Sequence, residues 1–478
     1  MMKRDKIVKV LIAVVASLVC ALLPAGVFGI DGLTVIQQRV IALFVFAALM
    51  WILEPVPIWT TSVGLMVLLL LTTSDSMFVG LKDVEAENFG NIVSYKGLMA
   101  SFADPVIMLF MGGFCLAMAA TKTGLDRNLA RVLLKPFGTR SHNVVLGFMI
   151  ITAFLSMLMS NTATTAMMLA IIAPVLRLMP EGSTDRTALV MAIPVASDLG
   201  GVGTPIGTPP NAIAVGYLRN NLEFGVDISF GQWTFVMAPF VLVFLLISWL
   251  ILIRLFPLHQ KHVSIAIEGK FRTDREAVIV YVTAAVTTLL WMTDRFTGIN
   301  SNTVALIPLA VFAMTGVIGV KELKSLNWDI LWLVAGGFAL GVGLNQSGLA
   351  KALVASIPFG TWSPLIVLAG SGLICFAMST FMSNSGTAAL LIPILSAVAL
   401  GMKDVLEPWG GPQTLLIGVA ICASMAQSLP ISTPSTAMAY ATGYITQRQM
   451  ATSGMTIGVL GMILGYAWLI GAIRLGLF

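Results

Sequence analysis

Apolar segments long enough to cross a lipid bilayer recur along almost the whole chain, and no other feature limits its possible folds so strongly. A membrane-spanning helix needs about 20 apolar residues, and 58% of the 478 residues are hydrophobic whereas 10% are charged. A soluble domain carries about 25% charged residues, so the composition excludes that class. The segments are continuously apolar, whereas strands of a membrane barrel alternate apolar and polar residues. We therefore expect an all-α polytopic, multi-pass protein embedded in the lipid bilayer of the cell (inner) membrane.

The first apolar segment, residues 7–29, follows a short basic stretch. A basic start before an apolar core is also the pattern of cleaved signal peptides. In a chain this hydrophobic we expect the segment to be retained. Residues 1–33 then form an extra N-terminal span that precedes the rest of the fold.

Two halves of the chain match each other in sequence. Four short motifs recur in the same order at offsets of 223 to 225 residues, which chance similarity among common membrane residues does not explain. The pairs are Gly112-Gly113-Phe114 with Gly336-Gly337-Phe338, Thr123-Gly124-Leu125 with Ser347-Gly348-Leu349, Met159-Ser160-Asn161 with Met382-Ser383-Asn384, and Pro-Ile-x-Thr-Pro at 205–209 with 430–434. The chain is therefore predicted to contain two repeats, residues 34–256 and 272–478.

Each repeat contains five spans and one apolar segment that is too long for a single crossing. These long segments cover about residues 143–176 and 352–402. At 1.5 Å per residue, each fits a re-entrant helical hairpin that enters and leaves the membrane on one side. Five crossings is an odd number, so the second repeat begins on the face opposite to the first. The sequence thus predicts inverted-topology repeats, with about 11 transmembrane helices and two re-entrant hairpins.

The distribution of basic residues predicts the orientation. With the N-terminus inside, 19 of the 27 Lys and Arg residues fall on the inner side, which agrees with the excess of basic residues in cytoplasmic loops. We therefore predict an N-in, C-out topology. The same bias accounts for the net charge of +5, so we expect no nucleic-acid partner.

Four polar segments interrupt the apolar spans: residues 160–165, 203–211, 383–387 and 428–436. The Ser-Asn pairs of the first and third are strong helix N-caps, which predicts an unwound tip in each hairpin. Thr-Pro pairs in the second and fourth interrupt helical hydrogen bonding, so these spans should be discontinuous. Small polar residues also form close-packing faces between helices. Because both features recur in both repeats, and broken backbone in a membrane must line a cavity or be buried in protein, we favour a shared binding site.

Charged residues are scarce around this predicted site. Within the two hairpins and the two broken spans, Asp198 is the one charged side chain. Helix N-termini favour anions, and carbonyl and hydroxyl oxygens favour Na⁺. A multiply charged anion bound here needs co-bound cations or must be protonated, because burying uncompensated charge is too costly. Asp198 is therefore a possible coupling acid, as a cation ligand or a proton carrier, and a structural acid is the alternative.

At these residues the chain resembles the divalent anion/sodium symporter family, whose members carry di- and tricarboxylates or sulfate. The resemblance covers nearly all of the chain beyond the first span. It implies that the substrate contacts Asn161, Thr162, Thr208, Pro209, Asn384, Ser385, Thr433 and Pro434. It also implies two or more Na⁺ sites, the first on Ser156, Ser160, Asn161 and Gly207 and the second on Ser379, Asn384 and Ser432. The family is dimeric, so the resemblance further implies a homodimer in which a transport domain moves like an elevator against a scaffold.

These features predict a secondary active transporter for Na⁺-coupled import of C4-dicarboxylates such as succinate, malate or fumarate. The alternative is a dicarboxylate exchanger, or a sulfate or tricarboxylate carrier on the same scaffold. Ser385 departs from the family pattern, which usually has Thr there, and leaves the preferred substrate size open. An enzyme is not expected because no His lies in any span. Broken helices in a repeated arrangement favour alternating access over a channel.

Overall fold

The computed structural model describes residues 4–83, 88–180, 182–221, 223–263 and 270–478. The residues in these ranges form helices, and their β-structure is limited to two isolated bridges. Among them, nine helical segments are long and apolar enough to cross a membrane, which supports the multi-pass membrane fold. Helix α1 (Arg4–Leu22), the predicted extra span, is not one of the nine because charged residues occupy its first two turns. The total number of crossings stays a prediction.

The first half of the chain folds in the order expected from the spans. An amphipathic helix, α6, separates the first spans from a pair of helices at the predicted first hairpin. The helices are α2 (Val35–Leu53), α3 (Ile58–Thr73), α4 (Tyr95–Ala100), α5 (Pro105–Thr123), α6 (Leu125–Leu134), α7 (Ser141–Ser156), α8 (Asn161–Leu178), α9 (Thr184–Gly201), α10 (Pro209–Asn220) and α11 (Phe230–Leu255).

The second half repeats this order. Its helices are α12 (Arg275–Met292), α13 (Asp294–Thr297), α14 (Ser301–Val304), α15 (Leu306–Thr315), α16 (Val320–Lys324), α17 (Trp328–Gln346), α18 (Leu349–Ser356), α19 (Pro364–Phe381), α20 (Asn384–Gly401), α21 (Lys403–Leu406), α22 (Gly411–Met425), α23 (Pro434–Ala441) and α24 (Gln447–Arg474). The second helix pair, α19 and α20, begins at residue 364 rather than at the expected 352. The difference arises because residues 349–356 form the separate helix α18, the counterpart of α6, whose apolar composition hides its boundary in the sequence.

The predicted unwound tips are present in both helix pairs. In the first pair, α7 ends at Ser156 and α8 begins at Asn161. In the second pair, α19 ends at Phe381 and α20 begins at Asn384. Both tips end with a serine that caps the following helix, as the N-cap chemistry of the sequence predicts. Whether the pairs are re-entrant in a membrane stays a prediction.

Both predicted breaks in the later spans are also present. Residues 202–208 separate α9 from α10, and residues 426–433 separate α22 from α23. Thr208 and Thr433 have extended backbone, with φ of −148° and −140°, and each precedes the proline that begins the next helix. This agrees with the rule that a residue before proline avoids helical backbone, whereas proline itself is favoured at the first helical position.

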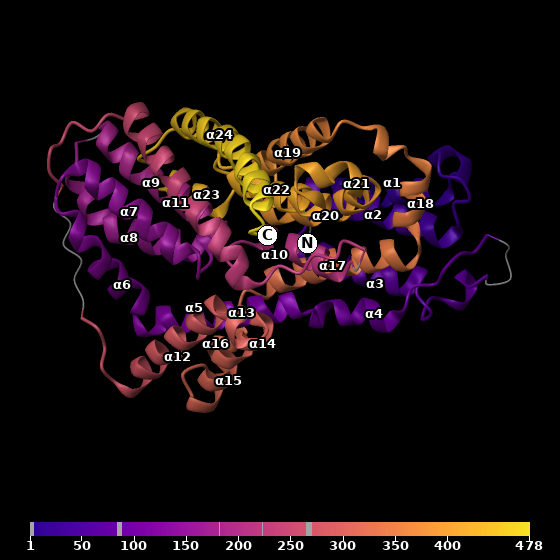
Figure 1. Ribbon diagram of the computed structural model, residues 1–478, viewed down its shortest axis with the longest axis horizontal. Coiled ribbons are helices and arrows are strands. Elements are labelled where there is room, and N and C mark those ends of the chain that lie inside the picture. Colours follow the sequence, from indigo (N-terminus) through magenta and orange to yellow (C-terminus); the bar gives the residue numbers. More distant parts are fainter. Residues whose placement is uncertain (1–3, 84–87, 181, 222, 264–269) are drawn as a thin grey trace.

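The second helix of each broken span packs against helices of the other half of the chain. Helix α10 packs against α20 and α22, and α23 packs against α8 and α9. Figure 1 shows α10 and α20 to α23 towards the middle of the molecule, with α7 and α8 to one side and α2, α3 and α18 to the other. Because the two exchanged helices begin at the two breaks, this packing brings the four polar segments together.

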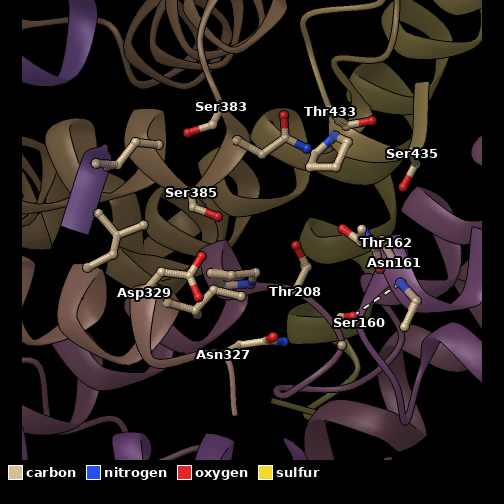
Figure 2. A pocket seen from close by; sticks show the side chains of 18 of the residues that line it. Ser160, Asn161, Thr162, Thr208, Asn327, Asp329, Ser383, Ser385, Thr433 and Ser435 are labelled. Atoms are coloured by element: carbon tan, nitrogen blue, oxygen red, sulfur yellow. Dashed lines mark hydrogen bonds between the residues drawn. The ribbon is translucent and has the colours of Figure 1, made fainter. Parts of the chain in front are cut away.

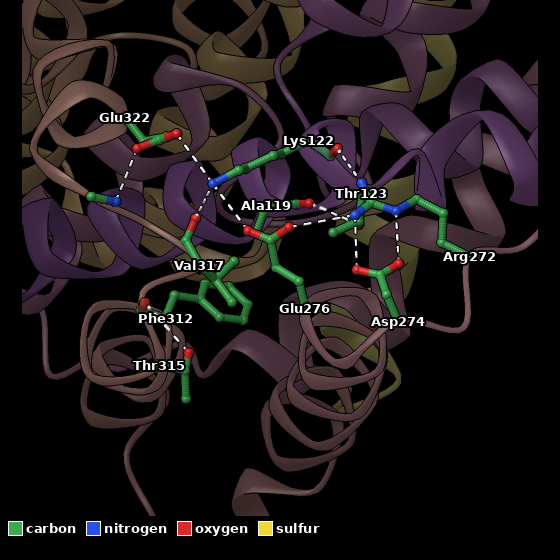
Figure 3. Close-up of polar contacts among 11 residues, drawn as sticks. Ala119, Lys122, Thr123, Arg272, Asp274, Glu276, Phe312, Thr315, Val317 and Glu322 are labelled. Atoms are coloured by element: carbon green, nitrogen blue, oxygen red, sulfur yellow. Dashed lines mark hydrogen bonds and ion pairs between the residues drawn. The ribbon is translucent and has the colours of Figure 1, made fainter.

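A cluster of charged side chains joins the end of α5 to α12 and α16 (Figure 3). Lys122 Nζ lies 3.1 Å from Glu276 Oε1 and 3.2 Å from Glu322 Oε1. Arg272 lies 2.8 Å from Asp274, and its guanidinium lowers the pKa of that carboxyl. The basic-residue count assigns all of these segments to one side of the membrane, and the structure places them at a common end.

Candidate functional site

A cavity of about 590 Å³ lies where the four polar segments meet (Figure 2). Both hairpin tips and both breaks border it, together with α5 and the first residues of α3 and α17. The lining includes all eight residues predicted to contact the substrate: Asn161, Thr162, Thr208, Pro209, Asn384, Ser385, Thr433 and Pro434. The structure therefore brings the predicted set together, although its role in binding stays a prediction.

The two hairpin tips carry the same local contact. Ser156 Oγ donates to Asn161 Oδ1 at 2.7 Å, and Ser379 Oγ donates to Asn384 Oδ1 at the same distance. Neither serine lines the cavity, whereas both asparagines do. Each serine therefore fixes the orientation of the neighbouring amide, whose oxygen is turned towards the serine.

Glycine at position 201 allows two oxygens of the predicted first Na⁺ site to approach α9 closely. A Cβ atom there would lie 2.7 Å from Asn161 Oδ1 and 3.1 Å from the Gly207 carbonyl oxygen, so a side chain would collide with both. Ser156 and Ser160 belong to the same tip, and Ser160 Oγ accepts the Ala163 N–H. Neutral oxygens of this kind suit Na⁺, and the predicted first site fits the residues present.

The predicted second Na⁺ site also consists of neutral oxygen donors. Ser379 Oγ donates to the Ala423 carbonyl oxygen at 2.9 Å as well as to Asn384, and Ser432 Oγ donates to the Thr380 carbonyl oxygen at 2.8 Å. All of these hydroxyls are buried. The second break and the second tip are thus held against each other by the residues predicted to surround the cation.

Asp198 connects the two halves of the site. Its side chain is fully buried on α9. Oδ1 accepts the Asn161 amide at 3.1 Å, and Oδ2 accepts the Thr433 hydroxyl at 3.0 Å. The neighbouring Ser197 Oγ donates to the Asn161 carbonyl oxygen at 2.8 Å. One carboxylate therefore contacts both the first tip and the second break.

The cavity also contains residues that sequence reasoning missed. Asn327 and Asp329 at the start of α17 line it, as do Ser383 and Ser435. Asp329 lies outside the hairpins and the broken spans and reaches the cavity from a different helix. The sequence carries a signal for it, because an acid in the first turn of an apolar span is uncommon. None of the described residues that line the cavity is Lys or Arg.

Comparison with known families places the chain. Residues 4–473 match the model described as the sodium:sulfate symporter transmembrane region. The chain belongs to this family. Membership confirms the resemblance seen in the paired Ser-Asn tips and identifies a Na⁺-coupled membrane transporter.

Individual relatives support the same assignment. The sodium-dependent dicarboxylate transporter SdcS of Staphylococcus aureus strain USA300 is 29% identical over 463 residues, covering 89% of this chain and 84% of SdcS. SdcS of strain bovine RF122 / ET3-1 matches with the same identity and coverage. Among solved structures, the YdaH transporter of Alcanivorax borkumensis is 14% identical and has a TM-score of 0.55 over 80% of this chain and 88% of that protein. This last likeness concerns the fold alone.

Proposed function

We propose that the protein imports C4-dicarboxylates together with Na⁺. The observation that carries this proposal is the cavity formed by two repeat-related Ser-Asn tips and two repeat-related Thr-Pro breaks, without Lys or Arg among its described lining residues. Such a cavity offers polar contacts to an anion but no fixed positive charge. The name of SdcS, a sodium-dependent dicarboxylate transporter, supports both the substrate class and the coupling ion.

Four helix N-termini border the cavity and favour an anion with two charged ends. Helices α8, α10, α20 and α23 begin at Asn161, Pro209, Asn384 and Pro434, all of which line it. Free N–H groups and the positive ends of helix dipoles attract carboxylates. Because one pair of N-termini comes from each half, a dicarboxylate can place one carboxylate at each pair. The volume also lies within the usual range for small-molecule sites, about 300–1,000 Å³.

Coupling to Na⁺ follows from residues shared between the predicted cation and substrate sites. Asn161 and Asn384 line the cavity, while each amide oxygen is turned towards its serine and the predicted Na⁺ site. Bound Na⁺ orders the tip on which the substrate contacts lie and supplies the positive charge that the protein lacks. The protein therefore holds the anion well only when Na⁺ is present, and this differential affinity is what coupling requires.

The geometry further supports an inward-facing state of an alternating-access cycle. Residues 57–59, Asn327 and Asp329, at the starts of α3 and α17, border the cavity. In the N-in topology these helix starts lie on the cytoplasmic side. On the opposite side, Asn220 Nδ2 donates to Asp104 Oδ2 at 2.8 Å and Tyr217 Oη donates to the Gly337 carbonyl oxygen at 2.7 Å. These contacts join α10 to α5 and α17.

We assign the moving part to the two hairpins and the two broken spans, in an elevator-type motion against a scaffold. Helices α5, α12, α14 and α15 pack on one another and carry the charged cluster around Lys122, which ties them at one end. An outward-facing state requires the α10 contacts with α5 and α17 to break, whereas the scaffold contacts persist. The homodimer stays a prediction, which cross-linking in native membranes tests.

Uptake of labelled succinate into proteoliposomes tests the proposed function. An inward Na⁺ gradient should drive accumulation, and replacing Na⁺ by choline should remove it. Unlabelled malate and fumarate should compete, whereas sulfate and citrate should not. Accumulation of sulfate or citrate in place of succinate would contradict the substrate class. Uptake that needs internal succinate but no Na⁺ would favour the exchanger.

A further inference from the structure

Asp198 is a charged residue of the site that the internal repeat does not duplicate. The two breaks are related by an offset of 225 residues, and at this offset the counterpart of Asp198 is Ala423. At this position the second half therefore offers only the backbone carbonyl of Ala423, whereas the first half offers the carbonyl and the side-chain carboxylate of Asp198. Asp198 contacts Asn161 of the predicted first Na⁺ site, but it is not among the residues predicted to bind Na⁺ in either site.

The contacts of Asp198 are those of an ionised carboxylate. Both carboxylate oxygens accept hydrogen bonds, one from the Asn161 amide and one from the Thr433 hydroxyl. The orientation of the Asn161 amide is fixed independently, because its oxygen accepts the Ser156 hydroxyl. The Asn161 amide nitrogen cannot accept a proton from a carboxyl group, and the Thr433 hydroxyl does not accept one while it donates to Oδ2.

A fully buried carboxylate needs a positive partner. None of the described residues that line the cavity beside Asp198 is Lys or Arg, and two neutral hydrogen bonds do not compensate a buried charge. The neighbouring Ser435 provides a second observation. Its side chain is fully buried on the cavity wall, where its hydroxyl also interacts with the Asp198 carboxylate. The buried carboxylate is therefore surrounded by neutral groups alone, which leaves its charge without compensation until a cation binds.

Thr433 can join such a ligand set. Its hydroxyl lies 3.0 Å from Asp198 Oδ2 and also 3.1 Å from the hydroxyl of Thr436. Its proton can turn towards Thr436, which leaves an oxygen lone pair facing the carboxylate. Thr433 and Ser435 lie at the cavity wall (Figure 2), and Asp198, which also lines the cavity, adds a third oxygen to this set.

We propose that Asp198, Thr433 and Ser435 form an additional Na⁺ site, distinct from the two predicted on the hairpin tips. The inference deepens the proposed function, on which it rests: the extra cation adds one positive charge to the transported set. It also bridges the two halves, since its ligands come from α9 and from the second break. Binding at this site stabilises the contact between them.

The coupling ratio of transport tests the additional site. Reversal of succinate flux is measured in proteoliposomes while the voltage and the Na⁺ gradient are set independently, which gives the number of Na⁺ ions per succinate. Asp198→Asn keeps the size of the side chain and removes its charge, so its ratio should be one Na⁺ lower than that of the wild type. At a Na⁺ gradient of about tenfold and zero voltage, this loss lowers the limiting accumulation of succinate about tenfold.

A matched control tests whether removal of any buried carboxylate lowers the number of Na⁺ ions per succinate. Asp126 is also a buried acid, and it accepts a hydrogen bond from Thr121 away from the cavity. Asp126→Asn should keep the wild-type ratio. An unchanged ratio in Asp198→Asn overturns the additional site. A variant that keeps its Na⁺ ratio but loses one co-transported proton, followed with a pH-sensitive dye, also overturns it.

Na⁺-dependent thermal stability tests the site even if succinate is not the substrate. The midpoint of unfolding of purified protein is followed against Na⁺ concentration, with choline replacing Na⁺, because a ligand that binds the folded state stabilises it. The dependence should be shallower by one Na⁺ in Asp198→Asn, and Ser435→Ala should need several-fold more Na⁺ for the same stabilisation. Identical curves for all three proteins contradict the ligand set. Wild-type stabilisation by Na⁺ without any succinate uptake overturns the proposed substrate alone.

Discussion

The two halves of the molecule share the contacts at their hairpin tips but not those at their breaks. Ser156 and Asn161 meet at the same distance as Ser379 and Asn384. In the first break, Asn211 Nδ2 donates to the carbonyl oxygens of Gly201 at 3.0 Å and Thr204 at 2.8 Å. The two tips are thus duplicates, whereas the first break depends on an amide.

Hydroxyl groups hold the second break instead. At the position of Asn211 the second half has Thr436, whose backbone N–H donates to Thr433 Oγ1 at 3.0 Å. The packing around the breaks differs as well: Ile206 is 6% exposed, whereas its counterpart Ile431 is 65% exposed. We interpret this difference as the mark of a single conformational state. In the proposed alternating-access cycle, the two predicted inverted repeats would be packed unequally in each state, while the tips predicted to contact the substrate stay alike.

The largest expected effect concerns the shared tips. Asn161→Ala and Asn384→Ala should each reduce succinate uptake to about 1% of wild type or less, because each removes an oxygen of a predicted Na⁺ site together with a substrate contact. Uptake normalised to purified protein in the vesicles measures this. Near-normal uptake in both variants would contradict the site, and strong loss in only one would show that the tips are not equivalent.

An intermediate effect concerns the stability of the two breaks. Ile206→Ala removes a buried side chain and should lower the free energy of unfolding by about 2–4 kcal/mol. Ile431→Ala removes an exposed one and should change it by about 0.5 kcal/mol or less. Thermal unfolding in detergent without Na⁺ or substrate compares them. Equal losses of stability would show that the two breaks are packed alike in solution.

The smallest effect distinguishes the two predicted Na⁺ sites. Gly201→Ala adds a methyl group where Asn161 Oδ1 and the Gly207 carbonyl converge, and should raise the Na⁺ concentration for half-maximal uptake about tenfold. The counterpart position is Ala426, which already carries that methyl. Ala426→Gly therefore serves as the control and should shift the Na⁺ dependence less than about twofold. Similar shifts of the Na⁺ dependence in both variants would show that the two predicted Na⁺ sites do not differ at this position.

Much of the site was predictable because its chemistry is local. A Ser-Asn pair caps a helix and a Thr-Pro pair interrupts one whatever surrounds them, so the tips at Ser160 and Ser383 and the breaks at Thr208 and Thr433 follow from the sequence. The repeat then supplied the relation between them. By contrast, no local sequence signal marks where α18 ends, because an apolar connecting helix has the same composition as the start of the next span.

The missed features depend on contacts between distant segments. The hydrogen bond between Asp198 and Thr433 joins residues from different halves, and no spacing rule predicts it. Asp329 reaches the cavity only because α17 packs beside α3 and α20. Which charged residues meet in the site can therefore be learned only from how the helices pack, and not from their order along the chain.

The exchange of α10 and α23 between the halves has a consequence for biogenesis. The face that α10 buries is completed by α20 and α22, which leave the ribosome long after it does. During synthesis the first repeat therefore waits in the membrane with Asn211 and the backbone of its break lacking their final cover. Such an intermediate needs protection, by lipid, by the translocon or by a chaperone, until the last third of the chain arrives. Neither repeat is a self-sufficient folding unit, and a truncation after residue 256 should be degraded rather than inserted as a stable half.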